Sequence, residues 1–147
     1  MLPGIRSGQS ADLSAILQLL KSAGLPTADL ANAHEFQTWV IEDEGSLVGV
    51  IGLERFGSGA LLRSLAVAPE QRKRGWGTDL VARVEHDARG YGIQQLILLT
   101  ETAGPFFRGL GYAVTARSDV SEEVRQSAEF HSLCPVTAIC MRKALTR

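Results

Sequence analysis

The stretch LRSLAVAPEQRKRGWGTDL, residues 62–80, decides how this chain folds, because it joins a predicted strand to a predicted helix through a basic, glycine-containing turn. An apolar run ends at Pro69, and Gly75 and Gly77 then open a segment with helical periodicity. A helix start has N–H groups without intrahelical acceptors and about half a positive charge, so it favours an anion. Glycines let the backbone approach that anion closely. The junction therefore predicts a phosphate site, with a plain turn carrying solvated basic residues as the alternative.

The composition of the chain is that of one ordinary globular domain, which we expect to span residues 1–147. The formal net charge of −1 gives no basic field for nucleic acid or an anionic membrane. The N-terminus lacks a signal-peptide pattern, and no apolar run approaches the roughly 20 residues that span a bilayer. We therefore expect a cytoplasmic protein with reduced thiols at Cys134 and Cys140, the latter buried in a strand.

Hydrophobic periodicity on both sides of the junction predicts a mixed α/β (α+β) sheet, antiparallel at first and with helical crossovers later. The segment TWVIEDEGSLVGVIGLERF predicts a hairpin that turns at Glu44 and Gly45. The segment QLILLT is almost wholly apolar, which is typical of a strand covered on both faces. The predicted strands are 3–7, 38–43, 46–56, 60–67, 95–100, 111–117 and 136–142, and the predicted helices are 10–24 (capped by Ser10), 76–90, 103–109 and 121–130 (capped by Ser121).

Several other site classes are excluded by the residues present. Thr78 follows Gly77 where a Walker loop needs a lysine, and Leu80 stands where a dinucleotide-binding turn needs its third glycine. Trp76 falls on the apolar face of its predicted helix, which argues against a nucleic-acid surface. The histidines are scattered and predict no metal site.

The pattern Arg72-x-x-Gly75-x-Gly77, preceded by SLAVAP, resembles the acyl-CoA-binding motif of the GNAT family of N-acetyltransferases. The later segment PFFRGLGY, 105–112, resembles the family's second landmark, a short helix that ends in a Leu-Gly-aromatic turn. The resemblance implies a mostly antiparallel sheet flanked by helices, with a splayed central strand pair, acetyl-CoA as co-substrate, a small-molecule amine as acceptor and a homodimer. The coenzyme-binding residues that it implies are Leu65, Ala66, Val67, Arg72, Lys73, Arg74, Gly75, Trp76, Gly77, Thr78 and Phe107.

Two segments, LLRSLAV and SLCPVTAICMRKAL, more specifically resemble acetyltransferases associated with arsenic-resistance operons. That resemblance implies an amino acid or a toxic amino-acid analogue as acceptor, and a link to arsenic resistance. Two other functions stay open. One is a catalytically weak acetyl-CoA-binding or arsenic-sensing module, and the other is acetylation of protein N-termini or lysines.

Acetyl transfer to an amine needs a deprotonated amine, a polarised thioester carbonyl and a proton for the leaving thiolate. The backbone N–H of Val67, at the end of the splayed strand, is the candidate donor to the carbonyl oxygen. Glu54 and Glu101 are the candidate bases, and a solvent-facing edge charge is the alternative for each. The family pattern often has a proton-donating tyrosine where this chain has Phe107, which cannot donate.

Three side chains are candidates to replace that donor: Ser132, Cys134 and Tyr112. Ser132 and Cys134 are also candidates for lining the acceptor site. Arg63 lies in an apolar strand, four residues before Val67, so strand alternation predicts that both side chains share one face. A buried arginine needs either an internal carboxylate or an anionic group of the substrate, and both alternatives stay open.

Overall fold

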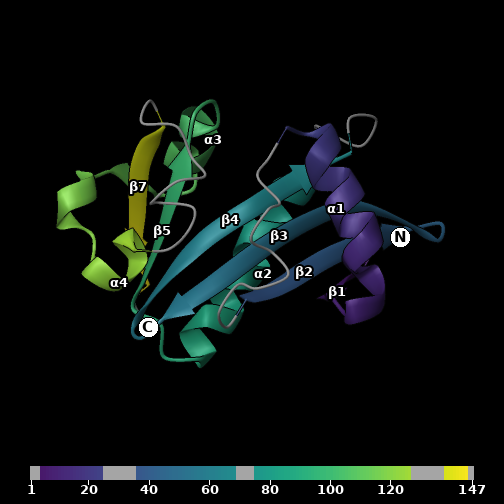
Figure 1. Ribbon diagram of the computed structural model, residues 1–147, viewed down its shortest axis with the longest axis horizontal. Helices are drawn as coiled ribbons and strands as arrows, with labels where there is room; N and C mark the ends of the chain where they lie inside the picture. Colours follow the sequence, from purple (N-terminus) through teal and green to yellow (C-terminus); the bar gives the residue numbers. More distant parts are fainter. Residues whose placement is uncertain (1–3, 25–35, 69–74, 127–137, 146–147) are drawn as a thin grey trace.

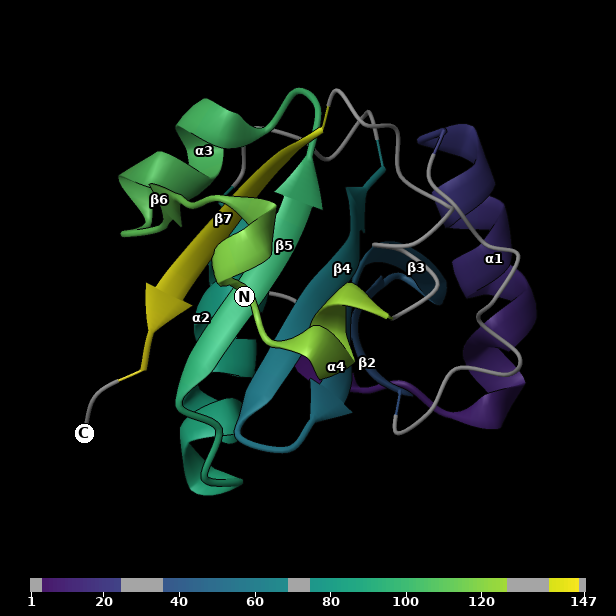
Figure 2. The ribbon, with the colours of Figure 1, turned by 60° about the vertical axis from the view of Figure 1, so that its left-hand side comes forward.

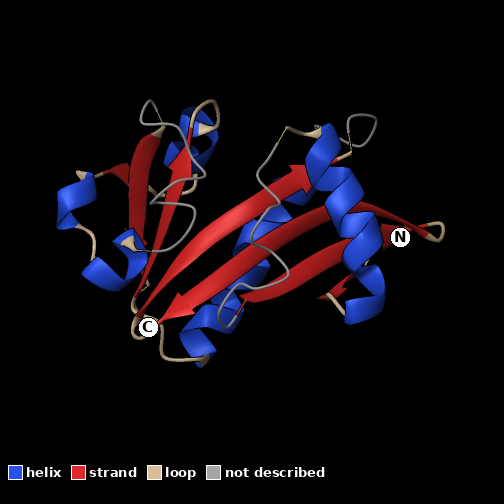
Figure 3. Ribbon diagram, in the orientation of Figure 1, coloured by secondary structure: helices blue, strands red, loops and turns tan. Residues whose placement is uncertain are grey.

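The computed structural model describes residues 4–24, 36–68, 75–126 and 138–145, which form a twisted sheet with helices on both faces (Figures 1 and 3). The described helices include none that is long and apolar enough to cross a membrane. The strands are β1 (Ile5–Ser7), β2 (Phe36–Asp43), β3 (Ser46–Phe56), β4 (Gly59–Val67), β5 (Gln95–Thr100), β6 (Ala113–Val114) and β7 (Ile139–Ala144). The α-helices are α1 (Leu13–Ser22), α2 (Trp76–Gly90), α3 (Gly104–Gly109) and α4 (Glu122–Arg125), with 3-10 turns η1 (Ser10–Asp12) and η4 (Arg117–Asp119).

The sheet has the strand order β1-β2-β3-β4-β5-β7-β6. All neighbouring strands are antiparallel except β4 and β5, which are parallel. A parallel pair cannot be joined by a tight turn, and α2 provides the crossover between these two strands. The mixed, mostly antiparallel sheet predicted from the sequence is therefore confirmed.

Helices cover the sheet unequally. The long α2 lies on one face, and α1 and α4 lie on the other (Figures 1 and 2). Four residues of α2 at helical spacing fill the larger core, namely Trp76, Leu80, Val84 and Ala88. On the opposite face, Ile16 and Leu20 of α1 pack on β2, β3 and β4. Cys140 is buried beside α4, as expected, and burial raises the pKa of its thiol.

The parallel contact between β4 and β5 is short. Only Gly59–Leu61 pair with Gln95–Ile97, and beyond these residues the two strands diverge toward their C-terminal ends (Figures 1 and 2). This divergence is the splayed central pair that the family resemblance implies. It opens the sheet at the end of β4, on the side where α2 begins.

A β-bulge in β4 separates the two ends of this strand. Val50 pairs with Ala66, but Gly52 pairs with Arg63, so β4 carries one residue more than β3 between these pairs. Ser64 within the bulge has a φ of 61°, a conformation that a side chain rarely adopts. An extra residue reverses the alternation of side chains that follow it.

The bulge overturns the expected shared face of Arg63 and Val67. Before the bulge, Leu62 packs in the core under α2, so Arg63 points to the face of α1 and α4. After the bulge, Val67 packs against the α2 core instead. The prediction from simple alternation was wrong because the sequence does not reveal the inserted residue.

Other element boundaries also differ from the predictions. The predicted strand 111–117 is reduced to β6, because residues 117–119 turn into η4. The last strand is β7, which begins and ends later than the predicted 136–142, and it lies between β5 and β6. The predicted first helix begins with the 3-10 turn η1, whose N-cap is Gln9, and continues as α1, whose N-cap is Asp12, so Ser10 is not the cap. α4 follows Ser121 as expected, but residues 127–130 of its predicted helix lie outside the described residues.

A buried polar cluster joins α2, the turn after α3, and β7. The Tyr112 hydroxyl donates to Glu85 Oε2 at 2.8 Å, and Lys143 Nζ donates to both Glu85 oxygens at 3.0 and 3.1 Å. Lys143 also donates to the Leu110 carbonyl at 2.8 Å. Burial first, and the Glu85 charge second, raise the pKa of Tyr112, so its phenol stays protonated. The cluster satisfies each polar group and fixes the turn that follows α3.

We expect Tyr112→Phe to lower the free energy of unfolding by about 1–2 kcal/mol, because it removes a hydrogen bond to a buried charged group. Urea denaturation measures this loss. The matched control is Tyr91→Phe, since the Tyr91 hydroxyl bonds Gln37 on the exposed surface and its loss should cost less than about 0.5 kcal/mol. Equal losses in the two variants would show that the buried cluster does not stabilise the fold.

Candidate active site

The end of β4 borders the region in which β4 and β5 have diverged and no longer pair, which we call the gap. The Ala68 N–H donates to the Val48 carbonyl at 2.8 Å, and Val67 lies opposite Gly49. Residues of an antiparallel pair alternate between hydrogen-bonded and non-hydrogen-bonded positions. The N–H and carbonyl of Val67 therefore point away from β3, toward the side from which β5 has diverged. The same alternation turns the Ala66 amide toward β3.

The first turn of α2 borders this gap. Gly75 is the N-cap with a φ of 81°, where an L side chain would be strained, and its carbonyl accepts the first intrahelical bond from Asp79 N–H at 3.0 Å. The N–H groups of Gly77 and Thr78 belong to the first turn, where the helix itself offers no acceptor. The Trp76 side chain is buried in the core beneath α2.

The basic part of the predicted phosphate site, Arg72, Lys73 and Arg74, lies outside the described residues. Ser132 and Cys134, the candidates for the acceptor site, lie outside them as well. Their predicted roles stay predictions.

A buried ion pair lies next to the β4 bulge, on the face opposite α2. Arg63 Nη1 is 3.4 Å from Glu54 Oε1, and the exposed fractions of these side chains are 0% and 6%. The guanidinium carbon of Arg63 also lies 5.7 Å from the centre of the Phe36 ring. Gly52 makes room for this ring, because a Cβ atom there would come within 2.6 Å of it. Glu54 is thus not a solvent-facing charge, and Arg63 has the internal carboxylate that was one of its two alternatives.

The other two described candidates for proton transfer, Glu101 and Tyr112, lie away from the Arg63–Glu54 pair. Glu101 follows β5 on the other side of the gap and is exposed. Tyr112 is buried, and its hydroxyl is engaged by Glu85, so it is a core residue and does not replace the missing proton donor. The structure brings Glu54 and Arg63 together and leaves Glu101 on a separate strand end.

The two phenylalanines of α3 have different environments. Phe107, in the position that the resemblance assigns to the coenzyme, is only 5% exposed and packs edge to face on Tyr112, with 5.5 Å between ring centres. Phe106 is exposed and lies against Gly77, so that its Cζ would be 3.4 Å from a Cβ atom placed there. Phe106, one residue before Phe107 in PFFRGLGY, is not among the site residues predicted from the sequence.

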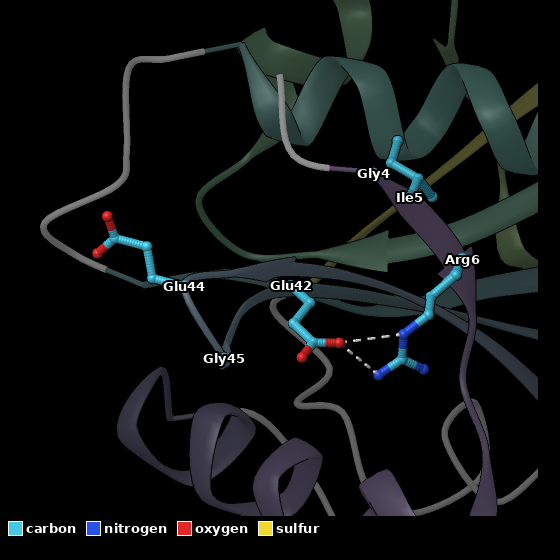
Figure 4. Close-up of a pocket in the computed structure, with 6 residues that line it drawn as sticks. All are labelled: Gly4, Ile5, Arg6, Glu42, Glu44 and Gly45. Carbon is cyan, nitrogen blue, oxygen red and sulfur yellow. Dashed lines mark hydrogen bonds and ion pairs between the residues drawn. The ribbon is translucent and has the colours of Figure 1, made fainter. Parts of the chain in front are cut away.

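A separate hollow of about 410 Å³ lies at the far end of the sheet, between β1 and the β2–β3 turn (Figure 4). Arg6, one of its lining residues, forms ion pairs with Glu42 at 3.1 Å and with Asp12 at 2.8 Å. The Arg6 hydrogen bond is the main reason why the pKa of Asp12 falls to about 2. We regard this hollow as structural. It is lined by Gly4, Ile5, Arg6, Glu42, Glu44 and Gly45.

The chain matches the model of a known domain family. Residues 34–114, more than half of the chain, match the family model described as Acetyltransferase (GNAT) domain. The chain belongs to the GNAT acetyltransferase family.

Relatives include proteins named amino-acid acetyltransferase. The one from Neisseria meningitidis serogroup A / serotype 4A is 26% identical over 125 residues, which are 82% of this chain and 29% of that protein. The chain thus spans less than a third of the length of this relative. The comparisons give no support to the narrower resemblance to arsenic-resistance acetyltransferases.

Solved structures show the same fold. N-acetylglutamate synthase from Neisseria gonorrhoeae, complexed with coenzyme A and N-acetyl-glutamate, superposes with a TM-score of 0.84 over 100% of this chain and 36% of that chain, at 24% identity. Rv2747 from Mycobacterium tuberculosis, solved in complex with CoA, has a TM-score of 0.80 and 27% identity, covering 98% of this chain and 100% of that chain. This second protein shows the fold over a chain of similar extent.

We expect Gly77→Glu to raise the Kd for coenzyme A about tenfold or more, because it puts bulk and negative charge beside the proposed diphosphate position. Calorimetric titration measures this change. Gly90→Glu is the matched control, since Gly90 ends the same helix and has open space around it. A Gly77→Glu protein that binds coenzyme A like the control would place the diphosphate elsewhere.

Proposed function

We propose that this chain is an amino-acid N-acetyltransferase that transfers the acetyl group of acetyl-CoA directly to an amine in a ternary complex. The observation behind this proposal is the gap between β4 and β5, with the Val67 amide directed into it, the α2 start at its border, and the Arg63–Glu54 pair near the bulge. The amino-acid acetyltransferases among the relatives support the acceptor class.

The proposed coenzyme position follows from the backbone groups on either side of the gap. The diphosphate lies against the N–H groups of Gly77 and Thr78, and the basic run before Gly75 adds positive charge. The pantetheine arm, with its amide groups, extends along the end of β4, beside Leu65 and Val67. The thioester carbonyl then accepts a hydrogen bond from Val67 N–H, which stabilises negative charge as it develops on that oxygen.

The transfer step forms one bond and breaks one. The amine nitrogen attacks the thioester carbon, the carbon–sulfur bond breaks, the amine loses a proton to a base, and the coenzyme thiolate takes up a proton. Glu54 and Glu101 remain the two candidate bases. Holding the amine and thioester together supplies much of the rate enhancement, as much as about 7–11 kcal/mol in the best intramolecular models.

The buried Arg63–Glu54 pair suits an amino-acid acceptor. A guanidinium binds a carboxylate through two parallel hydrogen bonds, and a carboxylate binds an ammonium group. The two side chains are paired with each other and buried in the structure, so in the proposed complex the acceptor replaces this ion pair by one between its carboxylate and Arg63 and one between its ammonium group and Glu54. Both side chains lie on the face of the sheet opposite α2. In the proposed complex the acceptor therefore approaches from one face and the diphosphate binds on the other.

Some narrower expectations stay predictions. A single domain over residues 1–147, a cytoplasmic location and a homodimer are of this kind. So is acetylation of a toxic amino-acid analogue.

The proposal is tested by measuring coenzyme A release from acetyl-CoA with a panel of amino acids, simple amines and peptides. We expect turnover with at least one free amino acid and far less with the corresponding decarboxylated amine. Tight acetyl-CoA binding without turnover on any amine would instead identify the weakly catalytic module. A preference for peptides would identify a protein acetyltransferase.

We expect Arg63→Lys to raise the KM for the amino acid about tenfold while the KM for acetyl-CoA changes little, because lysine keeps the charge but loses the bidentate geometry. Steady-state kinetics with each substrate varied in turn measures this. Lysine avoids the uncompensated buried Glu54 charge that alanine would leave. Equal increases in both KM values would show that Arg63 does not bind the acceptor.

A further inference from the structure

An exposed aromatic ring lies at the border of the proposed coenzyme site. Phe106 of the short helix α3 is 36% exposed, whereas Phe107, the next residue of this helix, is buried. Its ring edge would be 3.4 Å from a Cβ atom on Gly77, in the first turn of α2. The ring therefore lies beside the N–H groups to which we assign the diphosphate, and its solvent-facing side is available to a ligand.

This ring is held in place by a series of packed side chains. Phe106 packs edge to face on Phe107, with 5.0 Å between ring centres and 77° between planes. Phe107 packs in the same manner on Tyr112, at 5.5 Å and 73°. The Tyr112 hydroxyl is fixed by Glu85, which in turn accepts from Lys143. Because these contacts restrict the ring before binding, little side-chain entropy remains to be lost when a ligand packs on it.

We propose that Phe106 is a binding residue for the adenine ring of the coenzyme. The inference rests on the proposed function, because it takes the diphosphate to lie at Gly77 and Thr78. The thioester must enter the gap between β4 and β5, so the nucleotide must leave the first turn of α2 in the other direction, toward solvent. Adenine is the aromatic part of the coenzyme, and nucleic-acid bases stack readily on phenyl rings.

The experiment compares coenzyme A with 4′-phosphopantetheine, which has the thiol arm and one phosphate but no adenosine. Calorimetric titration gives the Kd of each compound for the wild-type chain, Phe106→Ala and Phe106→Tyr. We expect Phe106→Ala to raise the Kd for coenzyme A about tenfold and to leave the Kd for 4′-phosphopantetheine unchanged. The ratio of the two Kd values, which measures the preference for the complete coenzyme, therefore falls about tenfold. Phe106→Tyr keeps the ring and should bind both compounds like the wild type.

The matched control is Tyr91→Ala, which removes a ring of similar exposure, 42%, at the opposite end of α2. It should leave both Kd values unchanged. An unaltered preference in Phe106→Ala, or an equal loss for both compounds, would overturn the adenine contact while leaving the proposed function intact. A wild-type chain that binds no coenzyme A would overturn the coenzyme position itself.

Discussion

The structure depends on a short parallel contact, the three residue pairs between Gly59–Leu61 and Gln95–Ile97. A sheet normally covers the backbone of each inner strand with a neighbour on both sides. Here β5 leaves β4 early, and the end of β4 directs the Val67 N–H and carbonyl into the resulting gap. An extended ligand with amide groups fits such an edge. The α2 start, which borders the same gap, favours the phosphates of that ligand.

In the proposed reaction, the bulge in β4 lets the two substrates meet at this gap without competing for space. One inserted residue at Ser64 turns Arg63 to the face of α1 and α4, while Val67 stays with the α2 core. The buried ion pair of Arg63 and Glu54 therefore lies across the sheet from the α2 start. In the proposed reaction, the coenzyme phosphates and the acceptor charges are recognised on opposite faces, and only the reacting groups come together.

Sequence periodicity was sufficient for most of the elements but not for this arrangement. The glycine at position 75 marked the start of α2, and QLILLT marked a strand covered on both faces, because both signals are local. The bulge has no comparable signal, since serine rarely takes a positive φ, so the face of Arg63 was predicted wrongly. Phe106 and Phe107 could not be distinguished either, because burial in a six-residue helix depends on its packing and not on its sequence.

The central claim is that coenzyme A lies with its diphosphate at the first turn of α2 and its arm along β4. Amide NMR of the uniformly labelled chain tests it most directly. Adding coenzyme A should shift the N–H signals of Gly77, Thr78 and Val67 strongly, and leave those of Gly90 and Gly92, at the other end of α2, almost unchanged. If a saturating concentration of coenzyme A left the N–H signals of Gly77 and Val67 unshifted, the proposed coenzyme position would be wrong.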